Sequence, residues 1–151
     1  MQEINKEILI KSLQFNMFYP RDLSDFLGRI INFSYNLNDL NDAYITSNFD
    51  ELGYARRYCK KLLYYKLDEN NEDLIIKASV YGADGILAKT KCQKNIIELA
   101  KNCGFSLAFI AKNNFDLLKG ISKGFDVFIS DEKLLNSVPK NKYKGVINGL
   151  S

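Results

Sequence analysis

The chain has 151 residues, with 21 Lys and Arg against 18 Asp and Glu, and it contains neither His nor Trp. The absence of histidine excludes Ser-His-Asp and Cys-His nucleophile systems and HExxH zinc sites, so acid-base chemistry falls to Lys, Asp, Glu or Tyr. The net charge of +3 is too small to indicate a nucleic-acid-binding protein by itself.

The first 42 residues show no repeating pattern. Residues 4–18 fit a helix or a strand equally well, whereas residues 21–28 have the apolar spacing of a helix. Apolar and polar residues then alternate from Ile31 to Leu37, which predicts a strand, and residues 36–42 form a polar connection. This N-terminal region either covers the sheet or binds a protein partner. Its large apolar residues include Phe15, Met17, Phe18, Phe26, Phe33 and Tyr35.

From residue 43 onward, short apolar runs alternate with amphipathic segments. The amphipathic segments predict helices at 48–59, 70–81 and 92–103, and a fourth that begins at Asn113. Asn48 is a suitable N-cap, and a glycine ends three of the helices, at positions 82, 104 and 124. The apolar runs predict strands at 43–46, 61–66, 84–88, 105–110, 126–130 and 143–148.

Helical spacing also predicts which side chains face inward. For the first and fourth of these helices, the predicted inward residues are Phe49, Leu52, Tyr54, Ala55 and Tyr58, and Phe115, Leu117, Leu118 and Ile121.

Alternating strands and helices, with strands that are apolar on both faces, predict an α/β fold with a mostly parallel sheet. Right-handed crossovers leave two architectures, an open doubly wound sheet or part of a (β/α) barrel. No Gly-, Ser- or Pro-rich linker interrupts the chain, so we expect one domain over residues 1–151. Three cysteines without CxxC spacing, no signal peptide and no apolar stretch of membrane-spanning length indicate a cytoplasmic protein, which we expect to be bacterial.

Residues 62–151 resemble the later part of indole-3-glycerol phosphate synthase, a (β/α)8-barrel lyase of tryptophan biosynthesis. The segment KLLYYKLDENNEDLIIKASVYGADGILAKT, at 61–90, has that family's order of a strand with a Lys, a helix, a GAD junction and an apolar strand. The segments GFSLAFIAKNNFDLLKGISKGFDVFIS and VPKNKYKGVINGLS are similar to the units that follow.

The resemblance implies a reduced or incomplete TIM-barrel-like fold with six to seven strands and a rearranged N-terminal segment over 1–42. A full barrel takes roughly 250 residues, and a barrel without its eighth strand is expected to have exposed sheet edges. We expect either the N-terminal segment or a second copy in a homodimer to cover them.

The resemblance also implies a site. Lys66 falls on the catalytic lysine of the family's third strand, whereas the catalytic glutamates of its fifth and seventh strands fall at Ile110 and Ile147. The family's first-strand lysine motif has no counterpart in residues 1–42, and the chain stops before an eighth strand, so half of the phosphate site is expected to be absent. The resemblance therefore implies a degenerate homologue that lacks the parent ring closure and needs no metal or cofactor.

Lys89, Lys91 and Lys112 follow strands in the same way as Lys66, so together they predict a cationic mouth suited to a phosphorylated small molecule. Loop solubility is the alternative for these lysines, and N-capping is the alternative for Asp131. Two other functions stay open: an active lyase or isomerase that uses Lys66 with Asp68 or Asp131, and a protein-interaction module at the N-terminal region. Neither nucleic acid nor membrane is an expected partner. The predicted anion-binding residues are Lys89, Lys112, Asp131, Asn148 and Gly149.

Overall fold

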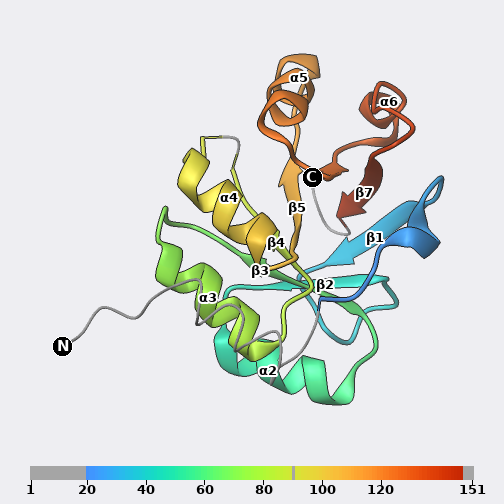
Figure 1. Cartoon of the computed structure of the whole chain (residues 1–151). Helices are drawn as coiled ribbons and strands as arrows, with labels where there is room; N and C mark the ends of the chain where they lie inside the picture. Colours follow the sequence, from blue (N-terminus) through green and yellow to red (C-terminus); the bar gives the residue numbers. More distant parts are fainter. Residues whose placement is uncertain (1–19, 90, 148–151) are drawn as a thin grey trace.

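The computed structural model describes residues 20–89 and 91–147, and its sheet is a closed barrel of seven parallel strands (Figure 1). Each strand pairs with the next along the chain, and the last pairs with the first. A reduced TIM-like α/β fold is therefore confirmed. The strands are β1 (Ile30–Ser34), β2 (Ala43–Thr46), β3 (Leu62–Lys66), β4 (Gly85–Leu87), β5 (Ser106–Ile110), β6 (Val127–Ile129) and β7 (Tyr143–Ile147).

Closure of the barrel shows that the expectation of exposed sheet edges was wrong. Ile30 to Phe33 of β1 pair in parallel register with Lys144 to Ile147 of β7. The seven strands thus satisfy one another's ladder hydrogen bonds without an eighth. Edge pairing therefore gives no reason to expect a dimer.

The helices cover β2 to β6 from outside, and α2, α3 and α4 pack against one another in sequence (Figure 1). The side chain of Asn48 accepts a hydrogen bond from Glu51 N at 3.0 Å, which confirms the predicted N-cap, and Gly82 and Gly124 end their helices in the left-handed conformation at φ 96° and 89°. The short α6 was not predicted. The helices are α2 (Phe49–Tyr58), α3 (Glu72–Tyr81), α4 (Lys94–Asn102), α5 (Asn114–Lys123) and α6 (Glu132–Leu135).

Aromatic side chains fill the barrel interior. The rings of Phe33 and Tyr64 lie edge to face with centroids 5.2 Å apart, and both side chains are fully buried. Gly85 and Gly145 give these rings their space, because a Cβ atom at either glycine would lie 2.4 Å from a ring carbon of Tyr64 or Phe33, respectively. The interior is a packed core, as in other small barrels.

The segment before β1 closes the amino-terminal end of the barrel. The helix predicted over 21–28 is only the 3-10 turn η1 (Ser24–Phe26), because the Asp22 carboxylate binds Ser24 N at 2.8 Å and forms a local turn. Leu23 and Phe26 pack against the interior cluster. Arg21 bonds through its backbone N–H to Asp84 Oδ1 at 2.7 Å. In (β/α) barrels the functional site lies at the opposite end, where the carboxyl ends of the strands meet.

The inward faces of two helices were predicted only in part. Leu52 and Ala55 of α2 and Leu117 of α5 are buried as expected. Four other predicted inward residues are exposed instead: Tyr54, Tyr58, Phe115 and Leu118. For Tyr54 the reason is that no described helix lies between β1 and β2, so this side of α2 lacks the neighbour that a regular βα unit would supply. Among the described helices, none has both the length and the apolar character that crossing a bilayer requires.

A buried thiol and a buried phenol, those of Cys103 and Tyr64, predict that the fold loses stability at alkaline pH. Burial raises the pKa of Cys103 to about 11, and it raises the pKa of Tyr64 above its usual value despite the opposing hydrogen bond to Ser106. The folded chain holds these protons more tightly than the unfolded chain, so their contribution to stability is complete below the unfolded pKa values and is lost as the pH rises through the folded ones.

We therefore expect the free energy of unfolding, measured by urea denaturation, to fall between about pH 9 and 11. Replacing Cys103 with Ala should make this fall less steep. A stability profile that is flat across this interval, or that is unchanged in the Cys103→Ala variant, would contradict the assignment of the titration to Cys103.

Candidate functional site

Lys66 lies at the carboxyl end of the barrel as the last residue of β3. Its side chain is 44% exposed, and Nζ lies 4.0 Å from Asp68 Oδ1. The same Nζ stands 5.7 Å from the centroid of the Tyr35 ring, which follows β1. The ammonium group is therefore accessible to a ligand and held between an acidic and an aromatic neighbour.

Of the other predicted lysines, Lys89 and Lys91 line one small pocket at the same end, and Lys112 does not line it. Lys89 follows β4 and lines a small pocket of about 60 Å³ together with Asp68 and Glu69. Lys112 follows β5, is exposed and uses its backbone N–H to bond Asp116 Oδ2 at 2.9 Å. The small pocket includes neither Lys66 nor Lys112.

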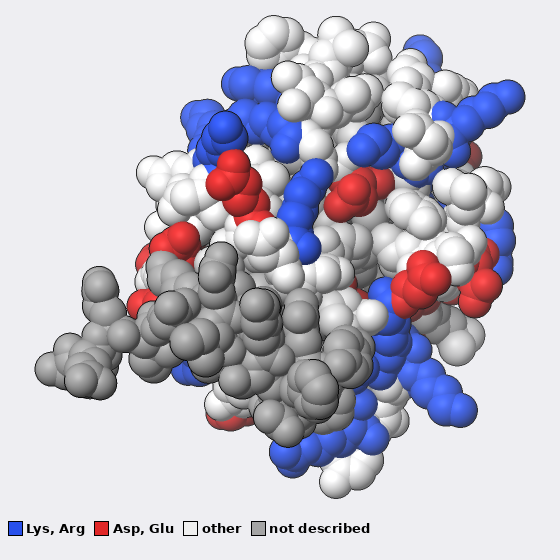
Figure 2. All heavy atoms as spheres, viewed as in Figure 1, with Lys and Arg blue, Asp and Glu red and all other residues white. Residues whose placement is uncertain are grey.

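Basic and acidic side chains are interspersed across the face shown in Figure 2 and do not form a patch of one sign. Asp131 accepts a hydrogen bond from Leu134 N at 2.8 Å, so it is the N-cap of α6. Asn148 and Gly149, the remaining predicted anion ligands, lie outside the described residues, as do Phe15, Met17 and Phe18. Phe33, another residue of the aromatic N-terminal region, is inside the barrel and cannot serve as a docking surface.

Ile110 and Ile147 place two apolar side chains at this end of the barrel. Ile110 ends β5 and packs against the interior cluster, and Ile147 ends β7 with 8% of its surface exposed. Neither side chain can donate or accept a proton. The two positions where the resemblance places glutamates thus hold apolar side chains at the ends of β5 and β7.

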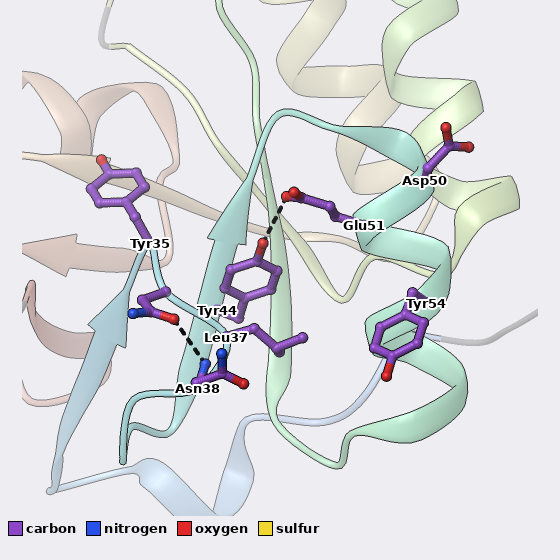
Figure 3. Close-up of a pocket in the computed structure, with 8 residues that line it drawn as sticks. Tyr35, Leu37, Asn38, Tyr44, Asp50, Glu51 and Tyr54 are labelled. Carbon is purple, nitrogen blue, oxygen red and sulfur yellow. Dashed lines mark hydrogen bonds between the residues drawn. The ribbon is translucent and has the colours of Figure 1, made fainter.

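A larger pocket lies beside the mouth, between the β1–β2 connection and α2 (Figure 3). Its volume is about 520 Å³. Glu51 extends from α2 toward β2 and accepts hydrogen bonds from Tyr44 Oη at 2.9 Å and Thr46 Oγ1 at 3.0 Å. Burial, followed by the hydrogen bond and charge of Glu51, raises the pKa of Tyr44, whereas its contact with Thr46 lowers it. The lining residues are Tyr35, Asn36, Leu37, Asn38, Tyr44, Asp50, Glu51 and Tyr54.

Polar contacts fix the wall of this pocket. Ser34 Oγ donates to Asp39 Oδ2 at 2.7 Å, and Asn38 N donates to Asn36 Oδ1 at 3.0 Å. Lys61 Nζ donates to Leu37 O at 2.8 Å and to Asn41 Oδ1 at 2.7 Å, and it also bonds Asp39 O. The lysine ammonium thus draws three oxygens of one loop together.

This pocket was not predicted from the sequence, although the sequence contains a signal for it. The polar connection at 36–42 is too short to hold a helix of ordinary length plus its turns. In a (β/α) barrel, such a connection leaves part of the helical layer open.

Within the described residues, no group of three Cys, Asp or Glu side chains is arranged to hold a metal ion. The three cysteines are free thiols.

Comparison with known proteins gives the fold. No family model and no curated protein sequence matches the chain. Thiamine phosphate pyrophosphorylase from Pyrococcus furiosus matches with a TM-score of 0.55 at 14% identity, over 86% of this chain and 79% of the other. The chain has a TIM-barrel-like fold.

Two further solved structures are similar. A cube-shaped, highly porous protein cage designed by fusing symmetric oligomeric domains matches with a TM-score of 0.55 at 8% identity, over 81% of this chain and 56% of the other. The 2-keto-3-deoxy-6-phospho-gluconate aldolase from Zymomonas mobilis matches with a TM-score of 0.45 at 15% identity, over 87% and 77%. At 14% and 8% identity, the likeness to the two structures that match with a TM-score of 0.55 extends to the fold alone.

Proposed function

We propose that this chain is a TIM-barrel protein of the indole-3-glycerol phosphate synthase type that binds a small phosphorylated molecule at its mouth without performing ring closure. The observation that carries the proposal is the pair Ile110 and Ile147 at the ends of β5 and β7. Ring closure needs a general acid and a general base, and losing such a group commonly costs a factor of about 10² to 10⁴ in rate.

The lysines support the binding half of the proposal. Lys66, Lys89 and Lys112 end or follow three consecutive strands, so their charges are presented at one end of the barrel. A phosphate that bridges two ammonium groups gains charge-assisted hydrogen bonds. Asp68, 4.0 Å from Lys66, opposes an anion, so a phosphate would have to displace Lys66 from this pair.

The first test is binding. Inorganic phosphate and phosphorylated sugars should raise the melting temperature, because ligand binding stabilises the folded state in proportion to RT ln(1 + [L]/Kd). In the Lys66→Met variant we expect affinity to fall about tenfold, the loss of one charge-assisted contact. Lys60→Met is the matched control, because Lys60 is an exposed lysine that precedes β3 at the opposite end of the barrel. Equal affinity in both variants would remove Lys66 from the site.

The second test is catalysis. The unaltered protein, mixed with the phosphorylated carboxyphenylamino sugar that the synthase family uses, should release no carbon dioxide above the buffer rate. Formation of indole-glycerol phosphate at ordinary enzymatic rates would overturn the proposal, whatever the binding result.

The alternative is an active lyase or isomerase that uses Lys66, which the Lys66–Asp68 pair favours. An ammonium group beside a carboxylate can pass a proton to substrate and recover it. This alternative predicts that Lys66→Ala abolishes turnover of its substrate and leaves the circular dichroism spectrum unchanged. A retained rate would reject it.

A further inference from the structure

We propose that the pocket between the β1–β2 connection and α2 is a second binding site, which takes a small organic cation such as a quaternary ammonium compound. This site differs in chemistry from the lysine-bearing mouth, and it does not depend on the function proposed for that mouth.

The size of the pocket suits a small ligand. Its volume of about 520 Å³ falls within the range of about 300 to 1,000 Å³ that small-molecule sites occupy. Its wall is preformed, since Lys61 and the Ser34–Asp39 hydrogen bond hold the β1–β2 connection in place. A ligand would thus bind without having to order this loop first.

The charge of the pocket selects against anions. Two carboxylates, Asp50 and Glu51, line it, and no Lys or Arg is among its described lining residues. The hydrogen bonds from Tyr44 and Thr46 to Glu51 both end on Oε2, so Oε1 makes none within the described part of the chain. A cation near Oε1 would be attracted without breaking the existing bonds to Tyr44 and Thr46.

The aromatic lining favours an organic cation over a metal ion. Tyr35 stands on the β1 side of the pocket, Tyr54 on α2, and Tyr44 between them (Figure 3). The negative face of a tyrosine ring attracts an ammonium group, and rings of this kind recognise quaternary ammonium ligands. The ring of Tyr35 already has such a contact with Lys66 Nζ, 5.7 Å from its centroid, so the ligand would rely on the rings of Tyr44 and Tyr54.

Acidic residues in the first turn of a helix are common for another reason, because they complement the helix dipole. The chain contains an internal control for that effect. Asp73 occupies the first turn of α3 in the same way, but it does not line the pocket. If Glu51 binds a ligand, replacing it should weaken binding and replacing Asp73 should not. If both residues only stabilise their helices, neither replacement should change binding.

The experiment compares choline with 3,3-dimethylbutan-1-ol, its uncharged carbon isostere, at constant ionic strength. Backbone amide NMR shifts report where each compound binds. Choline should shift the amides of Asn36, Asn38 and Glu51, and its affinity should exceed that of the alcohol by about tenfold or more. Equal affinities, no shifts with choline, or shifts only elsewhere in the chain would overturn the proposal.

The variants test the residues. Glu51→Gln keeps an acceptor for Tyr44 and removes the charge, and we expect it to weaken choline binding about tenfold. Tyr54→Leu should also weaken it, whereas Asp73→Asn should leave the affinity unchanged. Phosphate binding by the mouth should persist in Glu51→Gln, so failure of this proposal and failure of the proposed function can be told apart.

Discussion

Replacing Asp84 with Ala is expected to lower the free energy of unfolding by about 3 to 5 kcal/mol, the cost of breaking a buried ion pair from one side. Domains of this size are commonly stable by only 5 to 15 kcal/mol. The variant should therefore unfold at a much lower urea concentration, as measured by circular dichroism at 222 nm.

The reason lies in the contacts of this carboxylate at the amino-terminal end of the barrel. The Asp84 side chain has no exposed surface, and its oxygens accept hydrogen bonds from the backbone N–H groups of Arg21 and Leu63 and from Arg56 Nη1, at 2.7 to 2.8 Å. It thereby joins the segment before β1, the helix α2 and the strand β3. Removing it leaves buried donors without their acceptor.

Burial raises the pKa of Asp84, and the hydrogen bonds and the two arginines only partly oppose this shift. A folded-state pKa above the unfolded value means that the contribution of Asp84 is largest at low pH and declines as the pH rises through the folded pKa. The loss of free energy of unfolding in Asp84→Ala thus comes from the buried donors that are left without an acceptor, and not from a strongly favourable ion pair.

Asp126 provides the matched control, because its carboxylate accepts a backbone hydrogen bond in the same way two βα repeats further on. It accepts a hydrogen bond from Leu107 N at 3.0 Å before β6, but it is half-buried and forms no ion pair within the described residues. Asp126→Ala should cost only about 1 kcal/mol. Asp84→Asn, which keeps one acceptor, should fall between the two. Equal losses at Asp84 and Asp126 would show that the arginine contacts contribute nothing.

Apart from the short α6, the sequence predicted the elements from residue 43 onward because their signals are local. Asn48 caps α2, Gly82 ends α3, and each apolar strand begins and ends within about two residues of its prediction. The pairing of β1 with β7 joins residues far apart in the chain, and no local pattern contains it. For that reason the sequence predicted exposed sheet edges where the structure pairs β1 with β7.

The candidate site was predictable only where it follows the strand ends. The sequence placed Lys66, Lys89 and Lys112 at one end of the barrel, because carboxyl ends of parallel strands share an edge. It did not predict Tyr54 as a pocket residue, because helical spacing assigns that tyrosine to the core. Its exposure depends on which helices are present beside α2, and this is a tertiary property.

The second large effect is expected inside the barrel, where Phe33→Ala should lower the free energy of unfolding by about 3 to 5 kcal/mol. Phe33 is fully buried against Tyr64 and over Gly145. The cost of such a cavity depends on how well the neighbours can fill it. Gly145 has no side chain to offer, and its strand is held by pairing on both sides, so the space should stay largely empty.

The same geometry predicts that a smaller side chain at position 33 and a larger one at position 145 compensate each other. Gly145→Ala alone would place a Cβ atom 2.4 Å from Phe33 Cε2, and we expect this overpacking to cost about 1 to 3 kcal/mol. Phe33→Leu alone should also destabilise the barrel. In the double variant the new methyl group enters the space the ring has left, so the combined loss should be smaller than the sum of the two single losses by about 1 kcal/mol. Urea denaturation of the four proteins measures this coupling. Strictly additive losses would mean that the Phe33 ring and the new methyl group do not compete for the space over Gly145.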